Sequence, residues 1–169
     1  IKASKKCKIK KLIFSSSATV YHQSNTAPFR ENYKLGATNP YGETKLIVEN
    51  YLKNFCKYNK SFAAICLRYF NPIGADVSGL LGEEVNSKSK NLIPNIYKTI
   101  VNKKRILKIF GKKHNTKDGT CIRDFIHIND LVNGHLSALD YLKSKNGWLA
   151  INLGTGMGYS VLDVVKCFQ

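Results

Sequence analysis

The feature that most constrains the fold is an almost continuous apolar run at residues 61–69, Ser-Phe-Ala-Ala-Ile-Cys-Leu-Arg-Tyr. Such a run suits a β-strand that is covered on both faces, as the strands of a parallel sheet are. A shorter apolar run lies at residues 11–14, and a long amphipathic segment separates the two. Strand, helix and strand in this order form a right-handed crossover unit. The sequence therefore predicts an α/β fold built on a parallel sheet.

The amphipathic segment predicts a helix over residues 41–58. Asn39 and Pro40 start it, and proline suits the first turn of a helix, where its missing N–H leaves no bond unmade. Tyr41 and Lys45 are four residues apart and therefore share one face of this helix. Apolar side chains at helical spacing predict the face that packs on the sheet: Ile47, Val48, Tyr51, Leu52 and Phe55.

Hydroxyl groups end the first strand. Ser15, Ser16 and Ser17 follow its apolar residues directly, and strands of open α/β sheets point their carboxyl ends at the crevice where ligands bind. An unperturbed phenol titrates near pH ~10, but a nearby ammonium favours the phenolate and lowers the pKa. A serine that binds the same substrate hydroxyl can relay its proton to the tyrosine. One of these serines, together with Tyr41 and Lys45, could thus deprotonate an alcohol.

The Tyr-x-x-x-Lys spacing is a weak signal when taken alone. It arises often by chance, with the tyrosine half buried and the lysine stem lying along apolar surface. The strand that ends in serines upstream favours the catalytic interpretation.

Five segments, in order and over almost the whole chain, resemble the UDP-glucose 4-epimerase family of extended short-chain dehydrogenase/reductases. They are residues 15–21, 39–45, 67–75, 119–127 and 152–154. Tyr-x-x-x-Lys marks only the superfamily. The serine motif, Arg-Tyr-Phe-Asn-Pro and Arg-Asp-Phe-Ile-His together indicate the epimerase branch.

The resemblance implies NAD-dependent epimerisation at carbon 4 of UDP-glucose and UDP-galactose through a transient 4-keto sugar. Tyr41 would accept the proton of the 4-hydroxyl, Ser17 would assist, and Lys45 would hold the nicotinamide ribose. The residues implied at the cofactor are Ser15, Tyr41, Lys45, Tyr69, Phe70 and Pro72.

The residues that the resemblance implies at the UDP-sugar are Ser17, Asn71, Asn91, Leu92, Lys108, Phe110 and Arg123. Arg123 suits the diphosphate, because a planar guanidinium can bind two phosphate oxygens at once. Three of these residues also have plain structural interpretations. Asn71 could be a turn residue before proline, Phe110 a core residue, and Arg123 the partner of Asp124 or of another acid.

The expected architecture is a partial NAD-binding Rossmann-type parallel sheet with a smaller mixed α/β substrate domain. Residues 1–71 and 124–153 would belong to the former, and residues 72–123 and 154–169 to the latter. The resemblance also implies an upstream portion that carries a Gly-x-x-Gly-x-x-Gly dinucleotide loop, and a homodimer of the full-length protein.

Further elements are predicted along the chain. Residues 106–111 suggest a strand, residues 129–142 and 160–168 suggest helices, and Asn91 caps another helix with Pro94 in its first turn. The predicted apolar face of the Asn91 helix is Ile93, Ile96, Tyr97, Ile100 and Val101. That of the 129–142 helix is Leu131, Val132, His135, Leu139 and Leu142.

The chain carries 27 lysines and arginines against 11 acidic residues, a net charge of +16. Such an excess suggests nucleic acid as a partner. The lysines are scattered, however, and neither interleaved aromatic and basic residues nor zinc-finger spacing occurs. We therefore predict no nucleic-acid partner and interpret most of the charge as solvated surface, with some attraction for an anionic substrate.

Metal, disulfide and membrane features are not indicated. The five cysteines are widely spaced without Cys-x-x-Cys, and His127, Cys121 and His135 do not match metal-ligand spacing. No stretch approaches the ~20 apolar residues of a membrane span. We predict no metal, no membrane partner and a cytoplasmic location.

The glycines at 154, 156 and 158 follow a predicted strand but fail the dinucleotide fingerprint, which would need glycine where Tyr159 stands. We assign this turn no cofactor role.

Two other functions stay open. A nucleotide-sugar dehydratase or decarboxylase of the same superfamily is one, although Ala18 and Thr19 stand where dehydratases of the superfamily commonly place an acidic pair. A binding module or fragment without catalysis is the other.

Overall fold

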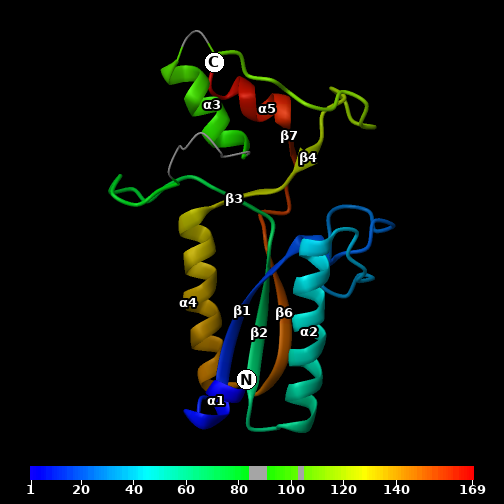
Figure 1. Cartoon of the computed structure of the whole chain (residues 1–169), viewed down its shortest axis with the longest axis vertical. Helices are drawn as coiled ribbons and strands as arrows, with labels where there is room; N and C mark the ends of the chain where they lie inside the picture. Colours follow the sequence, from blue (N-terminus) through cyan, green and yellow to red (C-terminus); the bar gives the residue numbers. More distant parts are fainter. Residues whose placement is uncertain (84–90, 103–104) are drawn as a thin grey trace.

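The computed structural model describes residues 1–83, 91–102 and 105–169. The chain starts near the amino-terminal ends of the main strands and ends among small elements at the opposite end of the molecule (Figure 1). The elements are α1 Lys2–Lys6, β1 Lys11–Ser17, the 3-10 turn η1 Ala18–Val20, α2 Pro40–Tyr58, β2 Ala63–Tyr69, β3 Asn71–Ile73, α3 Leu92–Val101, β4 Ile122–Arg123, β5 Phe125–His127, α4 Ile128–Ser144, β6 Gly147–Leu153, β7 Tyr159–Ser160 and α5 Val161–Lys166.

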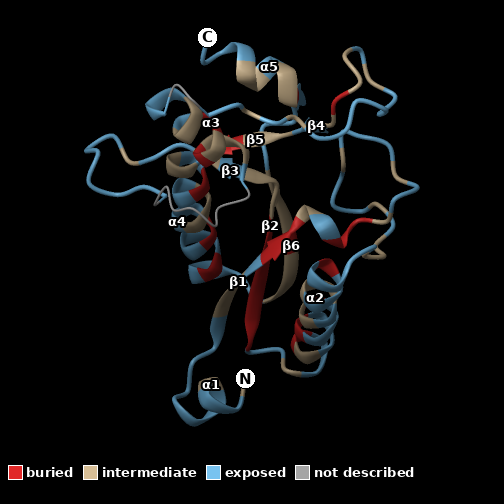
Figure 2. Cartoon of the chain, turned by 45° about the horizontal axis from the view of Figure 1, so that its top comes forward, coloured by how far each residue is buried: buried red, intermediate tan, exposed pale blue. Residues whose placement is uncertain are grey.

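The main sheet has the strand order β1-β2-β6, and both pairings are parallel. Helix α2 covers one face of this sheet and α4 covers the other (Figure 1). The central strand β2 is buried along its whole length except at Tyr69, as Figure 2 shows. The predicted α/β class and the predicted crossover are therefore confirmed. The three serines belong to β1 itself, because the ladder with β2 continues through Ser17.

Each face of the sheet has its own apolar core. The core under α2 consists of Leu52, Cys56, Phe62, Ala64, Cys66 and Ala150. The core under α4 consists of Ala63, Ile65, Leu67, Ala138 and Leu142. Burial raises the pKa of the Cys66 thiol to about 12, so this cysteine serves as a small apolar side chain.

Helix α2 begins where the sequence predicts, with the Asn39 side chain accepting a hydrogen bond from Gly42 N at 2.8 Å. Its buried face differs from the predicted one. Ile47 and Tyr51 are 58% and 52% exposed, whereas Glu49 is buried. The prediction was wrong for the two apolar residues because the helix turns Glu49 toward the sheet.

The faces of two other helices are also less covered than predicted. On α4, Leu131 and Leu142 are buried, but Val132 and Leu139 are about half exposed. On α3 the residues predicted to be buried and found exposed are Tyr97, Ile100 and Val101. Helical periodicity identified an apolar face in each case, and only part of that face packs within the described chain.

Small elements lie beyond the carboxyl ends of the main strands (Figure 1). Strand β3 pairs with β5 in parallel, and β4 pairs with β7 antiparallel. The strand predicted at residues 106–111 is wrong, because this segment pairs with no other strand in the described chain. Ile106 and Phe110 are more than 80% exposed.

A buried ion pair joins the central strand to α2. Arg68 Nε donates to Glu49 Oε1 at 3.0 Å and Arg68 Nη2 donates to Glu49 Oε2 at 2.6 Å. Ser16 on β1 donates to Glu49 Oε1 at 2.5 Å. Burial alone lowers the pKa of the Arg68 guanidinium, but its bonds to Glu49 and Tyr21 raise that pKa above its ordinary value. The cluster thus keeps the Arg68 guanidinium charged inside the fold.

None of the described helices is long and apolar enough to cross a lipid bilayer.

Glu49→Ala in the full-length protein should lower the free energy of unfolding by about 3–5 kcal/mol, because it leaves the Arg68 guanidinium buried without a counter-charge. Urea denaturation measures this value. Asp140→Ala is the matched control, since it removes only the exposed ion pair between Asp140 and Lys143 and should change the midpoint little. The account is contradicted if the two variants unfold at the same urea concentration.

Candidate active site

The carboxyl end of β1 lies against the first turn of α2. Ser17 Oγ accepts hydrogen bonds from Thr19 N at 3.2 Å and Thr19 Oγ1 at 3.0 Å, which closes the η1 turn. A Cβ added to Gly42 would lie 2.5 Å from Thr19 O. Only glycine fits between this turn and the helix. The Ser17 end of the strand and Tyr41, the neighbour of Gly42, are therefore held side by side.

Lys45 links the helix to the serine strand. Its Nζ donates to Ser15 O at 3.0 Å and lies 5.3 Å from the centre of the Tyr41 ring and 5.2 Å from that of Phe14. The Tyr41 side chain is 57% exposed. A lysine ammonium has three donors, and this bond uses one of them. The site thus offers an exposed phenol beside a positive charge that still has donors for a ligand.

Ser15 also faces the central strand. The hydroxyl groups of Ser15 and Tyr69 are hydrogen-bonded at 2.8 Å. The Tyr69 hydroxyl lies 2.5 Å from Nε2 of His135 on α4, and Nδ1 of this histidine bonds Leu131 O at 2.8 Å. The predicted residues Ser15, Lys45 and Tyr69 therefore form one hydrogen-bonded group.

A second network holds the loop that follows β1. Arg68 Nη1 donates to Tyr21 Oη at 3.0 Å and to Glu31 O at 3.1 Å. Tyr21 Oη donates to Asn152 Oδ1 at 2.7 Å, and Asn152 Nδ2 donates to Phe29 O at 3.0 Å. Burial raises the pKa of the Tyr21 phenol, so it stays a neutral donor. The loop is tied to β2 and β6 through these side chains.

The predicted residues Phe70, Asn71 and Pro72 follow β2 directly. Phe70 N donates to Leu153 O at 3.0 Å, and Asn71 N donates to Asp124 O at 3.0 Å. The turn interpretation of Asn71 is wrong, because Asn71 starts β3. All three residues lie at the carboxyl end of the sheet, next to Tyr69.

The other predicted substrate residues lie among the small elements. Asn91 and Leu92 stand at the start of α3 as predicted, although the Asn91 side chain does not cap the helix and donates to Glu83 Oε1 at 2.9 Å. Lys108 is exposed, and Phe110 is 83% exposed. Phe110 is thus not a core residue of the described chain. Within the described residues, no hydrogen bond or ion pair joins this group to Tyr41 or Lys45.

Arg123 and its neighbour have separate partners. Arg123 is exposed, and its Nη1 donates to Ile122 O at 2.8 Å. The carboxylate of Asp124 accepts hydrogen bonds at 2.8 Å from Thr155 N, Thr155 Oγ1 and Gly156 N. The structural pairing of Arg123 with Asp124 is therefore wrong, and the guanidinium remains available to an anion.

The same contacts describe the glycine-rich turn. In a phosphate-binding loop the backbone N–H groups face the ligand. Here Asp124 takes the N–H groups of Thr155 and Gly156. These two N–H groups are therefore already bonded to a carboxylate of the protein.

No group of His, Cys, Asp and Glu in the described ranges is arranged to hold a metal ion. His127 Nδ1 accepts a hydrogen bond from Asn129 N at 3.2 Å and caps α4.

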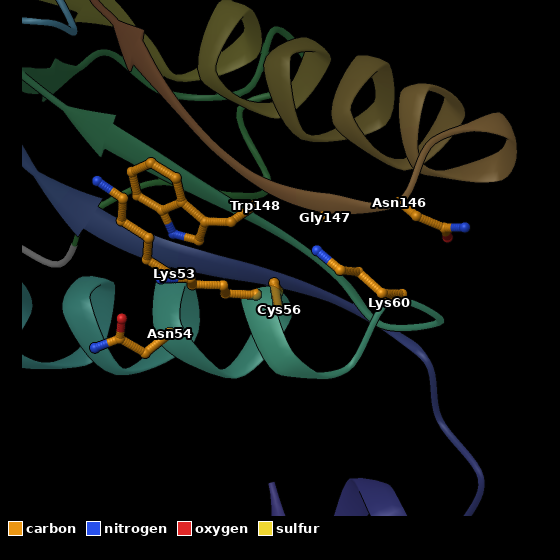
Figure 3. A pocket seen from close by; sticks show the side chains of 8 residues that line it. Lys53, Asn54, Cys56, Lys60, Asn146, Gly147 and Trp148 are labelled. Carbon is orange, nitrogen blue, oxygen red and sulfur yellow. The ribbon is translucent and has the colours of Figure 1, made fainter.

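A groove lies at the opposite end of the sheet. Its volume is about 560 Å³, and it is lined by residues of α2, of the loop after it and of the start of β6 with the residue before it: Lys53, Asn54, Cys56, Lys57, Lys60, Asn146, Gly147 and Trp148 (Figure 3). It sits at the amino-terminal end of β6, opposite the end that carries the serines. It is therefore separate from the candidate active site.

The sequence analysis did not predict that three residues would contact the site: Glu49, Arg68 and His135. A usable signal existed for the first two, because a lone arginine in a buried strand needs an acid nearby. Glu49 lies one helical turn after Lys45 and on the same face. His135 was predicted only as part of the buried face of its helix.

Gly42→Ala should destabilise the protein and lower its activity. Alanine gains about 0.5–1 kcal/mol of helix propensity, but the new Cβ would lie 2.5 Å from a backbone oxygen. Overpacking of this kind costs about 1–3 kcal/mol, so the clash outweighs the gain. Asn50→Ala, at an exposed position of α2, is the control and should be neutral or stabilising. Equal thermal unfolding of the two variants would refute the close approach.

Comparison with known proteins agrees with this geometry. A UDP-glucose 4-epimerase of Dictyostelium discoideum is 53% identical over 97% of the chain and 48% of its own length. One of Bacillus subtilis is 47% identical over 99% of the chain and 49% of its own length. The chain thus spans about half the length of the curated relatives it matches.

Solved structures agree as well. The chain is similar, with a TM-score of 0.92 and 38% identity, to a UDP-glucose 4-epimerase from Stenotrophomonas maltophila with bound NAD and formylated UDP-arabinopyranose, covering 98% of this chain and 49% of that one. An enzyme from Bifidobacterium longum in complex with NAD+ and UDP gives a TM-score of 0.90 at 44% identity, with coverage of 98% and 49%. The NAD dependent epimerase/dehydratase family matches residues 1–154, and the chain belongs to this family.

Proposed function

We propose that the full-length protein is a UDP-glucose 4-epimerase that interconverts UDP-glucose and UDP-galactose with NAD as its cofactor. The observation that carries the proposal is the grouping of Tyr41, Lys45, Ser15 and Ser17 at the carboxyl end of the parallel sheet. The names of the relatives support it, as do the NAD and UDP-containing ligands of the two solved structures.

The residues at this end of the sheet fit NAD. Lys45 has free donors for ribose hydroxyls, and Ser15 and Tyr69 offer hydroxyl groups beside it. Phe70 and Pro72 would flank the nicotinamide. When bound, NAD supplies the reversible oxidation and reduction of the sugar at carbon 4.

The protein's own residues would move the proton. Tyr41 takes the proton of the sugar 4-hydroxyl, and Ser17, whose oxygen already accepts two bonds from Thr19, donates its own proton to the same sugar oxygen. The positive charge of Lys45 stabilises the negative charge on the phenol oxygen. The 4-keto sugar would then turn in the site, and Tyr41 would return the proton to the 4-oxygen while the hydride taken up by NAD would return to the opposite face of carbon 4, so there would be no net redox change.

The UDP part would bind among the small elements. Arg123 presents an exposed guanidinium to the diphosphate. The other proposed contacts are Ser17, Asn71, Asn91, Leu92, Lys108 and Phe110. Residues 1–71 and 124–153 would then form part of the NAD-binding domain, and residues 72–123 and 154–169 part of the substrate domain.

The assembly and location belong to the same proposal. The exposed apolar residues Ile47 and Tyr51 on α2 support a homodimer of the full-length protein. A cytoplasmic location accords with five cysteines that are all free thiols.

The direct experiment incubates the full-length protein with NAD and UDP-glucose and separates the products by chromatography. UDP-galactose is the expected product. A dehydrated or decarboxylated sugar would assign the protein to another branch of the family, and the absence of any product would support a binding module.

Tyr41→Phe should lower kcat by about a hundredfold or more, because proton transfer loses its acceptor. The affinity for UDP, measured by calorimetry, should stay within about threefold, since the phenol oxygen acts on the sugar. Tyr58→Phe, on the most exposed tyrosine of α2, is the matched control and should keep full turnover. Retention of turnover by Tyr41→Phe would refute the assigned role.

A further inference from the structure

We propose that Asp124 is a positioning residue whose carboxylate holds together three connections between the main sheet and the small elements, and that it thereby fixes Arg123 relative to Tyr41. The inference rests on the function proposed above, in which Arg123 and Tyr41 act on the two ends of one UDP-sugar. It assigns a role to a residue that acts through its neighbours rather than on the substrate.

The three connections are short and lie close together. Phe70 links β2 to β3, Asp124 links β4 to β5, and residues 154–158 link β6 to β7. Strand β5 leads directly into α4, so each connection joins the main sheet or its covering helix to the small elements (Figure 1). Asn71 N donates to Asp124 O at 3.0 Å, and Phe70 N donates to Leu153 O at 3.0 Å. Backbone bonds therefore hold the three connections side by side.

The Asp124 carboxylate adds bonds between the second connection and the third. Its Oδ1 accepts hydrogen bonds from Thr155 N and Thr155 Oγ1, and its Oδ2 accepts one from Gly156 N, each at 2.8 Å. Neighbouring backbone N–H groups in a turn form a concave site for an anion, and here the anion is a side chain of the same chain. Hydrogen bonds to an ionised acceptor are about twice as strong as neutral ones. The carboxylate is thus a strong link between two of the connections.

A close contact brings in the first connection as well. A Cβ added to Gly154 would lie 2.6 Å from Asp124 Oδ2 and 2.9 Å from Cδ2 of Phe70. The carboxylate and the Phe70 ring therefore both lie against the same glycine. No side chain fits between the three connections at this point.

This arrangement matters for the proposed reaction. Arg123 directly precedes Asp124 and pairs with Tyr159 across β4 and β7. Ser17, which lies beside Tyr41, pairs with the last residue of β2, where the first connection begins. A misplacement of about 1 Å between reacting groups can lower a rate about 10²-fold. Holding the connections together keeps the diphosphate contact at a fixed distance from the residues that act on the sugar.

The test uses Asp124→Asn in the full-length protein with NAD and UDP-glucose. Asparagine keeps an oxygen that accepts from Thr155, but its amide nitrogen cannot accept a bond from Gly156 N. The value of kcat per UDP-binding site, with the sites counted by calorimetry, should fall about ten- to hundredfold. The Kd for UDP should stay within about threefold, because most of the proposed UDP contacts lie together among the small elements.

A second variant and a matched control accompany it. Gly154→Ala should give the same pattern, because its Cβ forces the connections apart. Asp118→Asn is the control. The Asp118 carboxylate also accepts three bonds, from Thr120 N, Thr120 Oγ1 and Ser160 Oγ, but these lie within the small elements. This variant should keep kcat within about twofold.

Hydrogen exchange without substrate keeps this inference separable from the proposed function. The amides of Phe70 and Asn71 donate to backbone oxygens and not to the carboxylate. In Asp124→Asn a peptide covering these two residues should nevertheless exchange at least about fivefold faster, as measured by mass spectrometry, because the three connections open as one unit. Asp118→Asn should leave this exchange unchanged.

Three results would overturn the inference. The first is that Asp124→Asn lowers only the number of UDP-binding sites and leaves kcat per site unchanged, as a merely structural role would. The second is that the affinity for UDP falls as much as kcat, which would confine the effect to Arg123. The third is faster exchange at residues 154–157 alone. If the wild-type protein makes no UDP-galactose, the proposed function fails, and the exchange result still decides whether the carboxylate holds the connections together.

Discussion

The buried cluster of Glu49, Arg68 and Ser16 is the interaction on which the site depends. Each member is a neighbour of residues that form the site. Ser16 lies between Ser15 and Ser17 on β1, Arg68 precedes Tyr69 on β2, and Glu49 follows Lys45 by one turn of α2. Because strand side chains alternate between faces, Ser16 and Arg68 point toward α2 while their neighbours face the other side. One interior cluster thus sets the position of the strand ends relative to the helix.

A charged cluster is not the strongest way to stabilise such an interior. Removing two charges from water costs several kcal/mol per ion, and apolar residues of similar size often stabilise as well or better. The cluster instead fixes the orientation of the helix relative to the strand. Apolar contact is non-directional, whereas the two bonds from the guanidinium to both oxygens of Glu49 require one orientation of helix and strand. The cluster is therefore better explained by the need to position Tyr41 and Lys45 accurately than by its contribution to stability.

The sequence could predict what depends on local pattern. Residues 61–69 indicated a doubly covered parallel strand, Asn39 and Pro40 indicated the start of α2, and the spacing of Tyr41 and Lys45 indicated a shared face. What failed depends on distant partners. A strand at 106–111 requires a neighbouring strand that the local sequence does not identify. An apolar helix face likewise does not show which residues will cover it. No local pattern predicts that Glu49 pairs with Arg68. The link from Tyr69 to His135 joins residues far apart in the chain, so only the fold discloses it.

The most direct test of this account is a crystal structure of the full-length protein with NAD and UDP-glucose. We predict that Tyr41 Oη and Ser17 Oγ both lie within hydrogen-bonding distance of the sugar 4-hydroxyl, while Lys45 Nζ binds the nicotinamide ribose and the Glu49–Arg68 pair remains closed. A complex in which the 4-hydroxyl contacts neither Tyr41 nor Ser17 would contradict the account.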